Sequence, residues 1–289
     1  MADPGVPADE LALFKYEGLG NDFLVLLDLE GRRPLDAALA RAACNRHRGL
    51  GADGLLRAGP AAPGSGDRMT FELLNADGSE AEMSGNGLRC LAHAAIDEGL
   101  VPAGPGDSFG VLTPAGRRQV NVRALGRGWL WASTEMGEPK VRGEQERCNV
   151  GHGQLFVDVG TPHLVVLGPD PATVEVAALG AELSSAFGVG TGGVNVEFVA
   201  LVPGRDEVTM RVWERGVGET MACGTGSVAA ATALHQWGRV GRKVTVNQPG
   251  GPAEVELRAD GTALLSGPTR RVGRSWLTWP VAQVPGGEL

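Results

Sequence analysis

Residues 84–95 read SGNGLRCLAHAA, and residues 223–234 repeat the same layout as CGTGSVAAATAL. Each copy starts with one polar side chain, Ser84 or Cys223, and continues through two glycines into an alanine-rich run. The copies lie about half a chain apart in a chain of 289 residues, and self-similarity at a fixed spacing indicates a duplicated unit. The sequence therefore predicts two matching halves whose glycine-led helices start at one shared cleft.

Short segments rich in β-branched residues alternate irregularly with fewer helical ones, which predicts a mixed α/β (α+β) chain with strands in the majority. We expect a first half at 1–135, rejoined by 269–289, and a second half at 136–268, with the junction near MGEPK at 136–140. The expected strands are 23–29, 154–159, 163–168, 195–202, 207–213 and 243–248, and the expected helices are 34–47, 86–100, 174–187 and 225–238.

Composition excludes several classes of protein. The net charge is −8 and no block of five basic residues occurs, which disfavours nucleic acid as a partner. No run of eighteen apolar residues is present, and MADPGVPADE at 1–10 lacks the features of a signal peptide, so we expect no membrane span and a cytoplasmic protein. The cysteines form no CxxC pair, which predicts reduced thiols rather than a metal site or disulfides: Cys44, Cys90, Cys148 and Cys223.

The glycines after Ser84 and Cys223 suit a binding site for an anion. Glycine lets a ligand approach the backbone closely, and a helix start carries unpaired N–H groups and about half a positive charge. A carboxylate or a phosphate fits there. The same field predicts that the pKa of Cys223 falls below its ordinary value of about 8.5, which favours Cys223 as a base or nucleophile. Two opposed proton carriers are suited to inverting a carbon centre.

Other interpretations stay open at this point. Each glycine turn alone is equally consistent with a structural helix cap. Neither turn ends in the G-K-[ST] of a P-loop, and neither follows the βαβ pattern of a dinucleotide site. A Cys-His-Asn hydrolase with Cys223 as nucleophile and His163 or His235 as base is the stronger rival, although it gives Ser84 no role.

With these residues in view, the sequence resembles the diaminopimelate epimerases, amino-acid epimerases that work without pyridoxal phosphate. The resemblance implies two similar domains, each a curled mixed sheet around a central helix, with the active site between them. It also implies a cofactor-free isomerase that interconverts LL- and meso-diaminopimelate for lysine and peptidoglycan synthesis, as a homodimer. The matching motifs are GLGNDF (18–23), NRHRGLGADGLL (45–56), NADGSEAEMSGNG (75–87), GTPHLVV (160–166), GVNVEF (193–198), WERGVGETMACGTG (213–226) and PGG (249–251).

The resemblance also assigns roles to single residues. Cys223 matches one catalytic thiol and Ser84 stands where the other is usual, while His163 and Glu214 match residues that tune the thiols. The pairs Gly85 with Asn86 and Gly224 with Thr225 match the amides that hold the α-carboxylate. The positions that match substrate-binding residues are Asn21, Asn75, Thr161, Asn195, Glu214 and Arg215.

Three positions depart from the family pattern. Thr161 replaces the usual asparagine, and Gly54 stands where some members have a glutamine. Ser84 replaces a cysteine, and the field of a helix start, worth about 0.3–1 kcal/mol when exposed, cannot make its hydroxyl an alkoxide at neutral pH. We consider a working natural serine variant, an engineered Cys-to-Ser substitution, and a diverged relative that acts on another amino acid or performs a one-base reaction such as α-proton exchange or elimination. A binding protein that has lost turnover through Ser84 is the non-enzymatic alternative.

Overall fold

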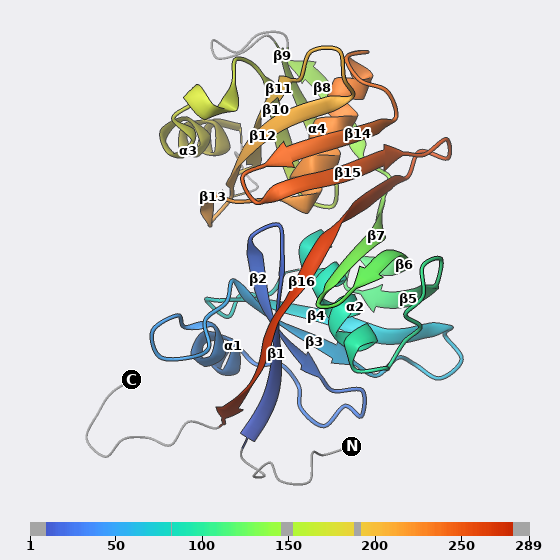
Figure 1. Ribbon diagram of the computed structural model, residues 1–289. Helices are drawn as coiled ribbons and strands as arrows, with labels where there is room; N and C mark the ends of the chain where they lie inside the picture. Colours follow the sequence, from blue (N-terminus) through green and yellow to red (C-terminus); the bar gives the residue numbers. More distant parts are fainter. Residues whose placement is uncertain (1–9, 82, 146–152, 188–191, 280–289) are drawn as a thin grey trace, which may run out of the picture.

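The chain folds into two halves, one above the other in Figure 1, joined by a long strand. A computed structural model describes residues 10–81, 83–145, 153–187 and 192–279. The outer ends of the expected first half, 1–9 and 280–289, lie outside the described residues, as do Glu82 of the glycine motif and Cys148. None of the helices in the described parts has the length and apolar character that crossing a membrane requires.

The strands form one continuous sheet. Those of the first half are β1 (Glu10–Gly18), β2 (Asn21–Leu27), β3 (Gly54–Gly59), β4 (Asp67–Asn75), β5 (Ser108–Thr113), β6 (Gly116–Gly126) and β7 (Trp129–Gly137). Those of the second half are β8 (Lys140–Gln145), β9 (Gly153–Asp158), β10 (Pro162–Leu167), β11 (Asn195–Leu201), β12 (Glu207–Glu214), β13 (Gly218–Thr220), β14 (Lys243–Gln248) and β15 (Gly251–Leu257), and β16 (Ala263–Thr278) joins the two. The helices are α1 (Ala37–Cys44), α2 (Gly85–Asp97), α3 (Val176–Phe187) and α4 (Gly224–Gln236), with a 3-10 turn, η1, at Pro171–Thr173.

The two halves share one pattern of strand pairing. In the first half β1 to β7 are neighbours in sequence order, and in the second half the order is β9, β10, β11, β12, β14, β15 and β16. The pairs β2–β3 and β4–β5 are parallel, and so are their counterparts β10–β11 and β12–β14. Every other pair along these two orders is antiparallel. This agreement confirms the predicted duplication of a mixed α/β unit.

Strand β16 belongs to both halves. Its first residues pair with β15, residues 263–270 pair with β7, and residues 270–278 pair with β1. Figure 1 shows it as a long ribbon that descends from the upper half into the lower one. Because β16 pairs with both β1 and β7, it closes the first half into a barrel. The exact boundaries at 135 and 269 stay a prediction.

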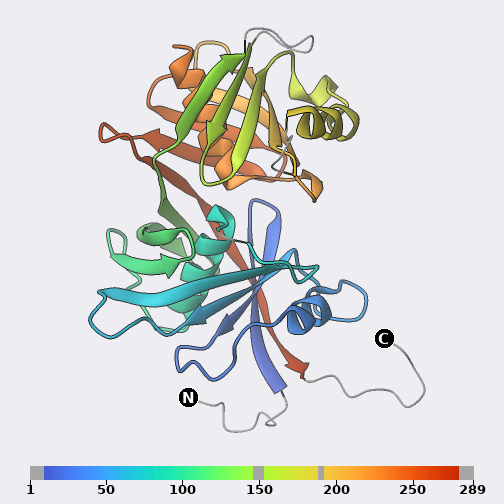
Figure 2. The same cartoon turned by 180° about the vertical axis from the view of Figure 1, so that it is seen from behind.

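Each half encloses one helix and carries another outside its sheet. Helix α2 is buried at every position from Gly85 to Ile96, and α4 is buried over most of its length. A helix that is buried all round needs apolar or small side chains on every face, which explains the alanine-rich repeats. Helices α1 and α3 bury only one face and lie outside the sheet on the same side of the molecule (Figures 1 and 2).

The predicted elements are all present, with shorter helices than expected. All six strands and all four helices predicted from local patterns form, and α1 is the most reduced, because Asp36 caps it and accepts a hydrogen bond from the amide of Leu39. The strands predicted from local patterns left out β1, β3, β5, β6, β7, β8, β13, β15 and β16.

The turn between β1 and β2 fastens the first half to the second. Leu19 at its tip has φ +57°, a conformation that side chains other than glycine rarely adopt, and it is 3% exposed. It packs in the core cluster that contains Cys223 and the buried residues around α4. The carbonyl of Leu19 comes so close to Gly250 that a Cβ atom there would lie 1.7 Å from its oxygen. The contact between the halves therefore requires glycine at position 250.

Gly250→Ala tests this contact. The added methyl group must push the β1–β2 turn away, and we expect a loss of about 1–3 kcal/mol in the free energy of unfolding. Thermal or urea unfolding measures the loss. The control is Gly273→Ala, because a Cβ atom at Gly273 meets nothing within 4 Å. Equal stability of the two variants would contradict the contact.

Candidate active site

The starts of α2 and α4 meet at the junction of the halves. A Cβ atom on Gly224 would lie 3.6 Å from the Cα atom of Gly85. The Cδ2 atom of Leu265, from β16, would lie 2.8 Å from a Cβ atom on Gly85 and 2.9 Å from one on Gly224. The two helix starts therefore abut over one leucine of the shared strand, and a larger residue at either position would have to displace the Leu265 side chain.

The residues before these glycines are the helix caps. Ser84 Oγ accepts a hydrogen bond from the amide of Gly87 at 3.0 Å, and Cys223 Sγ accepts one from the amide of Gly226 at 3.3 Å. Ser84 is partly exposed, whereas Cys223 is 5% exposed. The structure thus places two proton-carrying side chains at equivalent positions beside a pair of helix starts, where an anion is favoured.

The other predicted site residues lie at the matching edges of the two half-sheets. In the first half Asn75 is paired with Gly54, at the edge where β2 also begins with Asn21. In the second half Asn195 is paired with His163, and Glu214 ends the neighbouring strand β12. The two sets of polar residues are far apart in sequence, but they lie at equivalent strand ends in the two halves.

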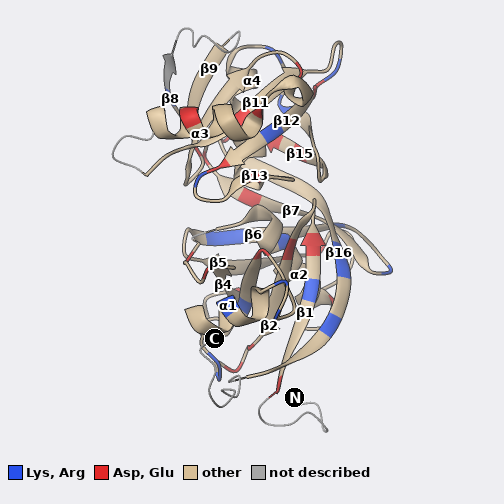
Figure 3. Ribbon diagram, turned by 90° about the vertical axis from the view of Figure 1, so that its left-hand side faces the viewer, with Lys and Arg blue, Asp and Glu red and all other residues tan. Residues whose placement is uncertain are grey.

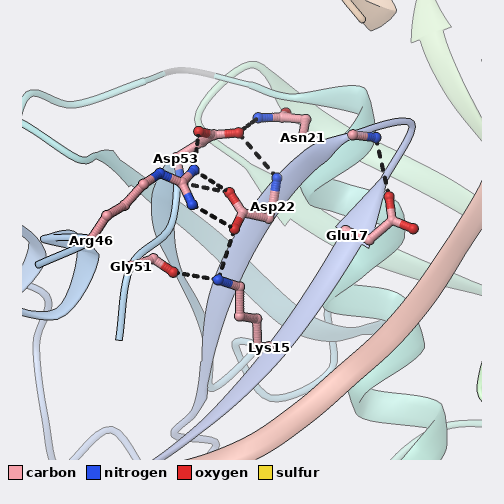
Figure 4. Close-up of polar contacts among 8 residues, drawn as sticks. Lys15, Glu17, Asn21, Asp22, Arg46, Gly51 and Asp53 are labelled. Atoms are coloured by element: carbon pink, nitrogen blue, oxygen red, sulfur yellow. Dashed lines mark hydrogen bonds and ion pairs between the residues drawn. The ribbon is translucent and has the colours of Figure 1, made fainter. Parts of the chain in front are cut away.

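An ionic network holds Asn21 in place (Figure 4). The Asn21 side-chain amide donates to Asp53 Oδ2 at 2.7 Å, and Arg46 binds both Asp53 Oδ1 and Asp22 Oδ1 at 2.7 Å. Lys15 Nζ lies 2.8 Å from Asp22 Oδ2. Burial alone would raise the pKa of Asp22, but the hydrogen bonds from Arg46 and Lys15 outweigh it and lower the pKa to about 2. The network stays ionised and leaves the carbonyl oxygen of Asn21 as an acceptor.

Asn75 and Arg215 make local contacts as well. The Asn75 side chain donates to Ser79 Oγ at 3.0 Å, which is the turn contact expected of asparagine. The backbone amide of Arg215 donates to Asn195 Oδ1 at 2.8 Å, and its guanidinium donates to the carbonyl of Gly193 at 3.3 Å. Asn195 therefore orients the start of the exposed turn that carries Arg215.

Gly54 is restricted by its neighbours. A Cβ atom there would lie 2.9 Å from the carbonyl oxygen of Leu74. A glutamine at this position would require β3 and β4 to shift apart. The departure from the family pattern at Gly54 thus has a steric reason in this chain.

Cys223 is surrounded by polar groups on the second half. Its backbone amide donates to Gln248 Oε1 at 2.8 Å, and its sulfur lies 3.4 Å from Thr225 Oγ1. The Glu214 carboxylate accepts a hydrogen bond from the hydroxyl of Thr220, and its charge acts on the nearby Cys223 thiol. Cys223 and Glu214 are thus near enough for each to shift the pKa of the other.

The expected fall in the pKa of Cys223 is wrong. Burial raises its pKa well above the ordinary value, and the nearby charges of Glu214 and Glu197 raise it further. The Thr225 hydroxyl and the Gly226 amide offset only part of this rise. Burial also raises the pKa of Glu214. Desolvation therefore dominates over the helix field, and the resting side chain of Cys223 is a neutral thiol.

His163 is fully buried behind this cluster and is hydrogen-bonded at both ring nitrogens. Its Nδ1 atom is 2.7 Å from Glu197 Oε1, and its Nε2 atom is 2.9 Å from Thr161 Oγ1. The Thr161 hydroxyl is thus engaged by His163. Both ring nitrogens of His163 are occupied, so His163 is not placed as the free base of a hydrolase. His235 is near the far end of α4, about 18 Å along the helix axis from Cys223.

Three residues of the site were not predicted from the sequence. Glu197, Gln248 and Asp53 contact His163, Cys223 and Asn21, respectively. The one sequence signal for Glu197 is a carboxylate inside the otherwise apolar strand NVEFVAL. Over the described residues, no group of three or more His, Cys, Asp or Glu side chains is arranged to hold a metal ion.

Comparison with known sequences identifies the relatives of the chain. A family model described as diaminopimelate epimerase matches residues 13–141 and 155–272. The diaminopimelate epimerase of Mycobacterium avium is 40% identical over 294 residues, covering 93% of this chain and 98% of the relative. That of Synechococcus elongatus is 37% identical over 277 residues, covering 91% and 96%.

Solved structures share the fold at much lower identity. A hydroxyproline epimerase from Agrobacterium vitis, with bound trans-4-hydroxy-L-proline, aligns with a TM-score of 0.74 at 17% identity, covering 94% of this chain and 93% of that one. A predicted epimerase from Pseudomonas aeruginosa aligns with a TM-score of 0.69 at 17% identity, covering 92% and 99%. The two-half architecture is therefore the same.

The raised pKa of Cys223 predicts slow alkylation at neutral pH. The rate of iodoacetamide labelling should rise only as pH passes above about 8.5, the ordinary value for cysteine, because the thiolate is the nucleophile. Labelling followed by mass spectrometry of the peptide that contains Cys223 measures the pH dependence. Cys223→Ala gives the background from the buried Cys44 and Cys90. An inflection below pH 8 would contradict the electrostatic account.

Proposed function

Because the chain belongs to the diaminopimelate epimerase family, we propose that it interconverts LL- and meso-2,6-diaminopimelate by moving a proton at the α-carbon. One observation carries this proposal. The two helix starts abut over Leu265, and each is capped by a side chain that can carry a proton, Ser84 or Cys223. A carbon held between the caps is accessible to one proton carrier on each face.

The α-carboxylate belongs at the shared helix starts. The amides of Gly85, Asn86, Gly224 and Thr225 lie in the first turns of α2 and α4, where the positive ends of both helix dipoles favour an anion. This charge also stabilises the carbanion that forms when the α-proton leaves. The second amino-acid group of the substrate extends toward Arg215 and Asn195, and the carbonyl oxygen of Asn21 is an acceptor for its ammonium.

Cys223 and Glu214 form the stronger proton carrier. At rest the thiol is protonated, and transfer of its proton to the Glu214 carboxylate yields a thiolate and a carboxylic acid without changing the net charge of the buried site. The raised pKa of Glu214 suits it to hold that proton. The thiolate then removes the α-proton and becomes a thiol again.

Ser84 is the weaker carrier on the opposite face. Its hydroxyl donates a proton to the carbanion as it takes one from an adjoining water, and the proton held by Glu214 neutralises the hydroxide that is left. Its own pKa excludes it as a base at neutral pH. Inversion of the α-carbon therefore requires slow proton donation by Ser84. Exchange of the α-proton with solvent requires only removal and return of a proton by Cys223. Hydrogen exchange should be faster than epimerisation.

The partners and location follow from the same site. We propose a small amino acid as the only substrate class, because the net charge of −8 disfavours nucleic acid, and acidic as well as basic positions occur in both halves in Figure 3. We place the protein in the cytoplasm, where reducing conditions keep Cys223 as a thiol. The cysteines of the described chain, Cys44, Cys90 and Cys223, are free.

We also propose a homodimer that uses the outer face of β16. Val272 is 56% exposed and Trp276 is 43% exposed on one face of this strand, and Trp129 of β7, paired with Arg270, is 43% exposed. These exposed apolar side chains suit a second copy of the chain. The mass in solution by sedimentation equilibrium tests this assignment, and a monomer at micromolar concentration would contradict it.

Proton exchange in heavy water tests the function. We expect NMR to show deuterium entering the α-position of diaminopimelate, with exchange at least about tenfold faster than inversion because Ser84 is the poorer carrier. Ser84→Cys should raise the rate of inversion toward the rate of exchange, and Cys223→Ala should abolish both. Exchange of neither LL- nor meso-diaminopimelate would overturn the proposal and favour a binding protein or a different amino-acid substrate.

A further inference from the structure

The duplicated fold is symmetric in its backbone but not in the pair of side chains beneath each central helix. Pairing of β2 with β3 places Phe23 and Leu56 in the first half where pairing of β10 with β11 places His163 and Glu197 in the second. Phe23 and Leu56 are buried in an apolar cluster. His163 and Glu197 are both 0% exposed and are bonded to each other at 2.7 Å. A pair that serves packing alone would not need these polar groups.

The Glu197 carboxylate lies directly under the first turn of α4. A Cβ atom on Gly226 would be 2.7 Å from Glu197 Oε1, and the Gly226 amide is the group that donates to Cys223 Sγ. At the equivalent position of the first half, a Cβ atom on Gly87 would instead meet Leu56 at 3.3 Å. Negative charge therefore reaches the helix start that carries the thiol, while the helix start that carries Ser84 rests on a leucine.

The carboxylate also fixes the imidazole. Because Glu197 accepts at Nδ1, that nitrogen keeps its proton in both the neutral and the charged ring. Nε2 is left to pair with the hydroxyl of Thr161. The second oxygen of Glu197, Oε2, is buried without a hydrogen-bond partner among the described residues. Leaving a buried carboxylate oxygen unsatisfied costs free energy, so this side chain is kept at an expense in stability.

From this geometry we propose that Glu197 is a positioning residue of the epimerase site, which holds His163 in one orientation and keeps negative charge beneath Cys223, making its thiolate a stronger base. The inference rests on the proposed function. A stronger base is useful here because the α-proton of an amino acid is a weak acid, and the serine on the other face gives no help in removing it. The titratable groups that face Cys223 are Glu214 from β12 and Glu197 from β11, with His163 of β10 behind Glu197.

Glu197→Gln tests the charge with little change of shape. A glutamine oxygen still accepts from His163 Nδ1, but the negative charge is gone, so the inflection in the pH dependence of Cys223 alkylation should move down by about one pH unit. We expect kcat for epimerisation to fall about tenfold and KM to change less than about twofold, because the thiolate becomes a weaker base. Glu256→Gln, on the exposed side of β15, is the matched control and should leave both readouts unchanged.

The outcomes separate this inference from the proposed function. Alkylation needs no substrate, so an unchanged inflection in Glu197→Gln overturns the inference even if the wild-type protein is an active epimerase. An unchanged kcat with a shifted inflection overturns it as well, because the charge would then have no role in turnover. If wild-type protein shows no proton exchange, the proposed function fails while the alkylation result still stands.

A second variant guards against a loss of folding. The double substitution His163→Phe with Glu197→Leu copies the apolar pair of the first half into the second and removes the buried charge. We expect it to fold cooperatively in thermal unfolding and to lower the alkylation inflection as Glu197→Gln does. If this variant keeps the wild-type inflection, the carboxylate has no electrostatic role and the inference is wrong.

Discussion

The contact between two glycines holds the site together. Gly85 and Gly224 start the two central helices, and a Cβ atom on either would come within 3 Å of Leu265 and force that side chain to move. This close approach aligns the positive ends of two helix dipoles on one point. It also fixes the separation of Ser84 and Cys223, which are the residues immediately before those glycines. A shared strand, β16, supplies Leu265 and ties both halves to this geometry.

The two halves have equivalent backbones but differ in the charged and polar residues beneath their central helices. The first half presents a hydroxyl over a leucine, and the second half presents a thiol over a carboxylate and an imidazole. Burial and the two carboxylates make the thiol hard to ionise, but a thiolate formed there is a strong base. In the proposed function, the proton chemistry is therefore concentrated on the face of Cys223, and we expect Ser84 to limit inversion rather than binding.

Local sequence patterns predicted the four helices, six of the strands and the repeat, but not the remaining strands or the long-range pairing. The helices that Ser84 and Cys223 cap could be predicted, because glycine turns and alanine-rich runs are local sequence signals. The role of β16 could not, since two of its three partners, β1 and β7, are distant in sequence and its second half is exposed or only partly buried. The helix start does favour a lower pKa of Cys223, as predicted, but burial raises that pKa by more. Burial depends on tertiary packing, which local sequence patterns do not show. Glu197 was missed because an apolar strand pattern conceals one carboxylate, whose importance appears only when His163 and Gly226 lie beside it.

The most direct measurement is a crystal structure of the protein with meso-diaminopimelate bound. The account predicts one substrate carboxylate within hydrogen-bond distance of the amides of both helix starts, with its α-carbon between Ser84 Oγ and Cys223 Sγ. A carboxylate bound to only one helix start, or an α-carbon beyond the reach of Cys223, would contradict the central claim that the abutting helices form the proton-transfer site.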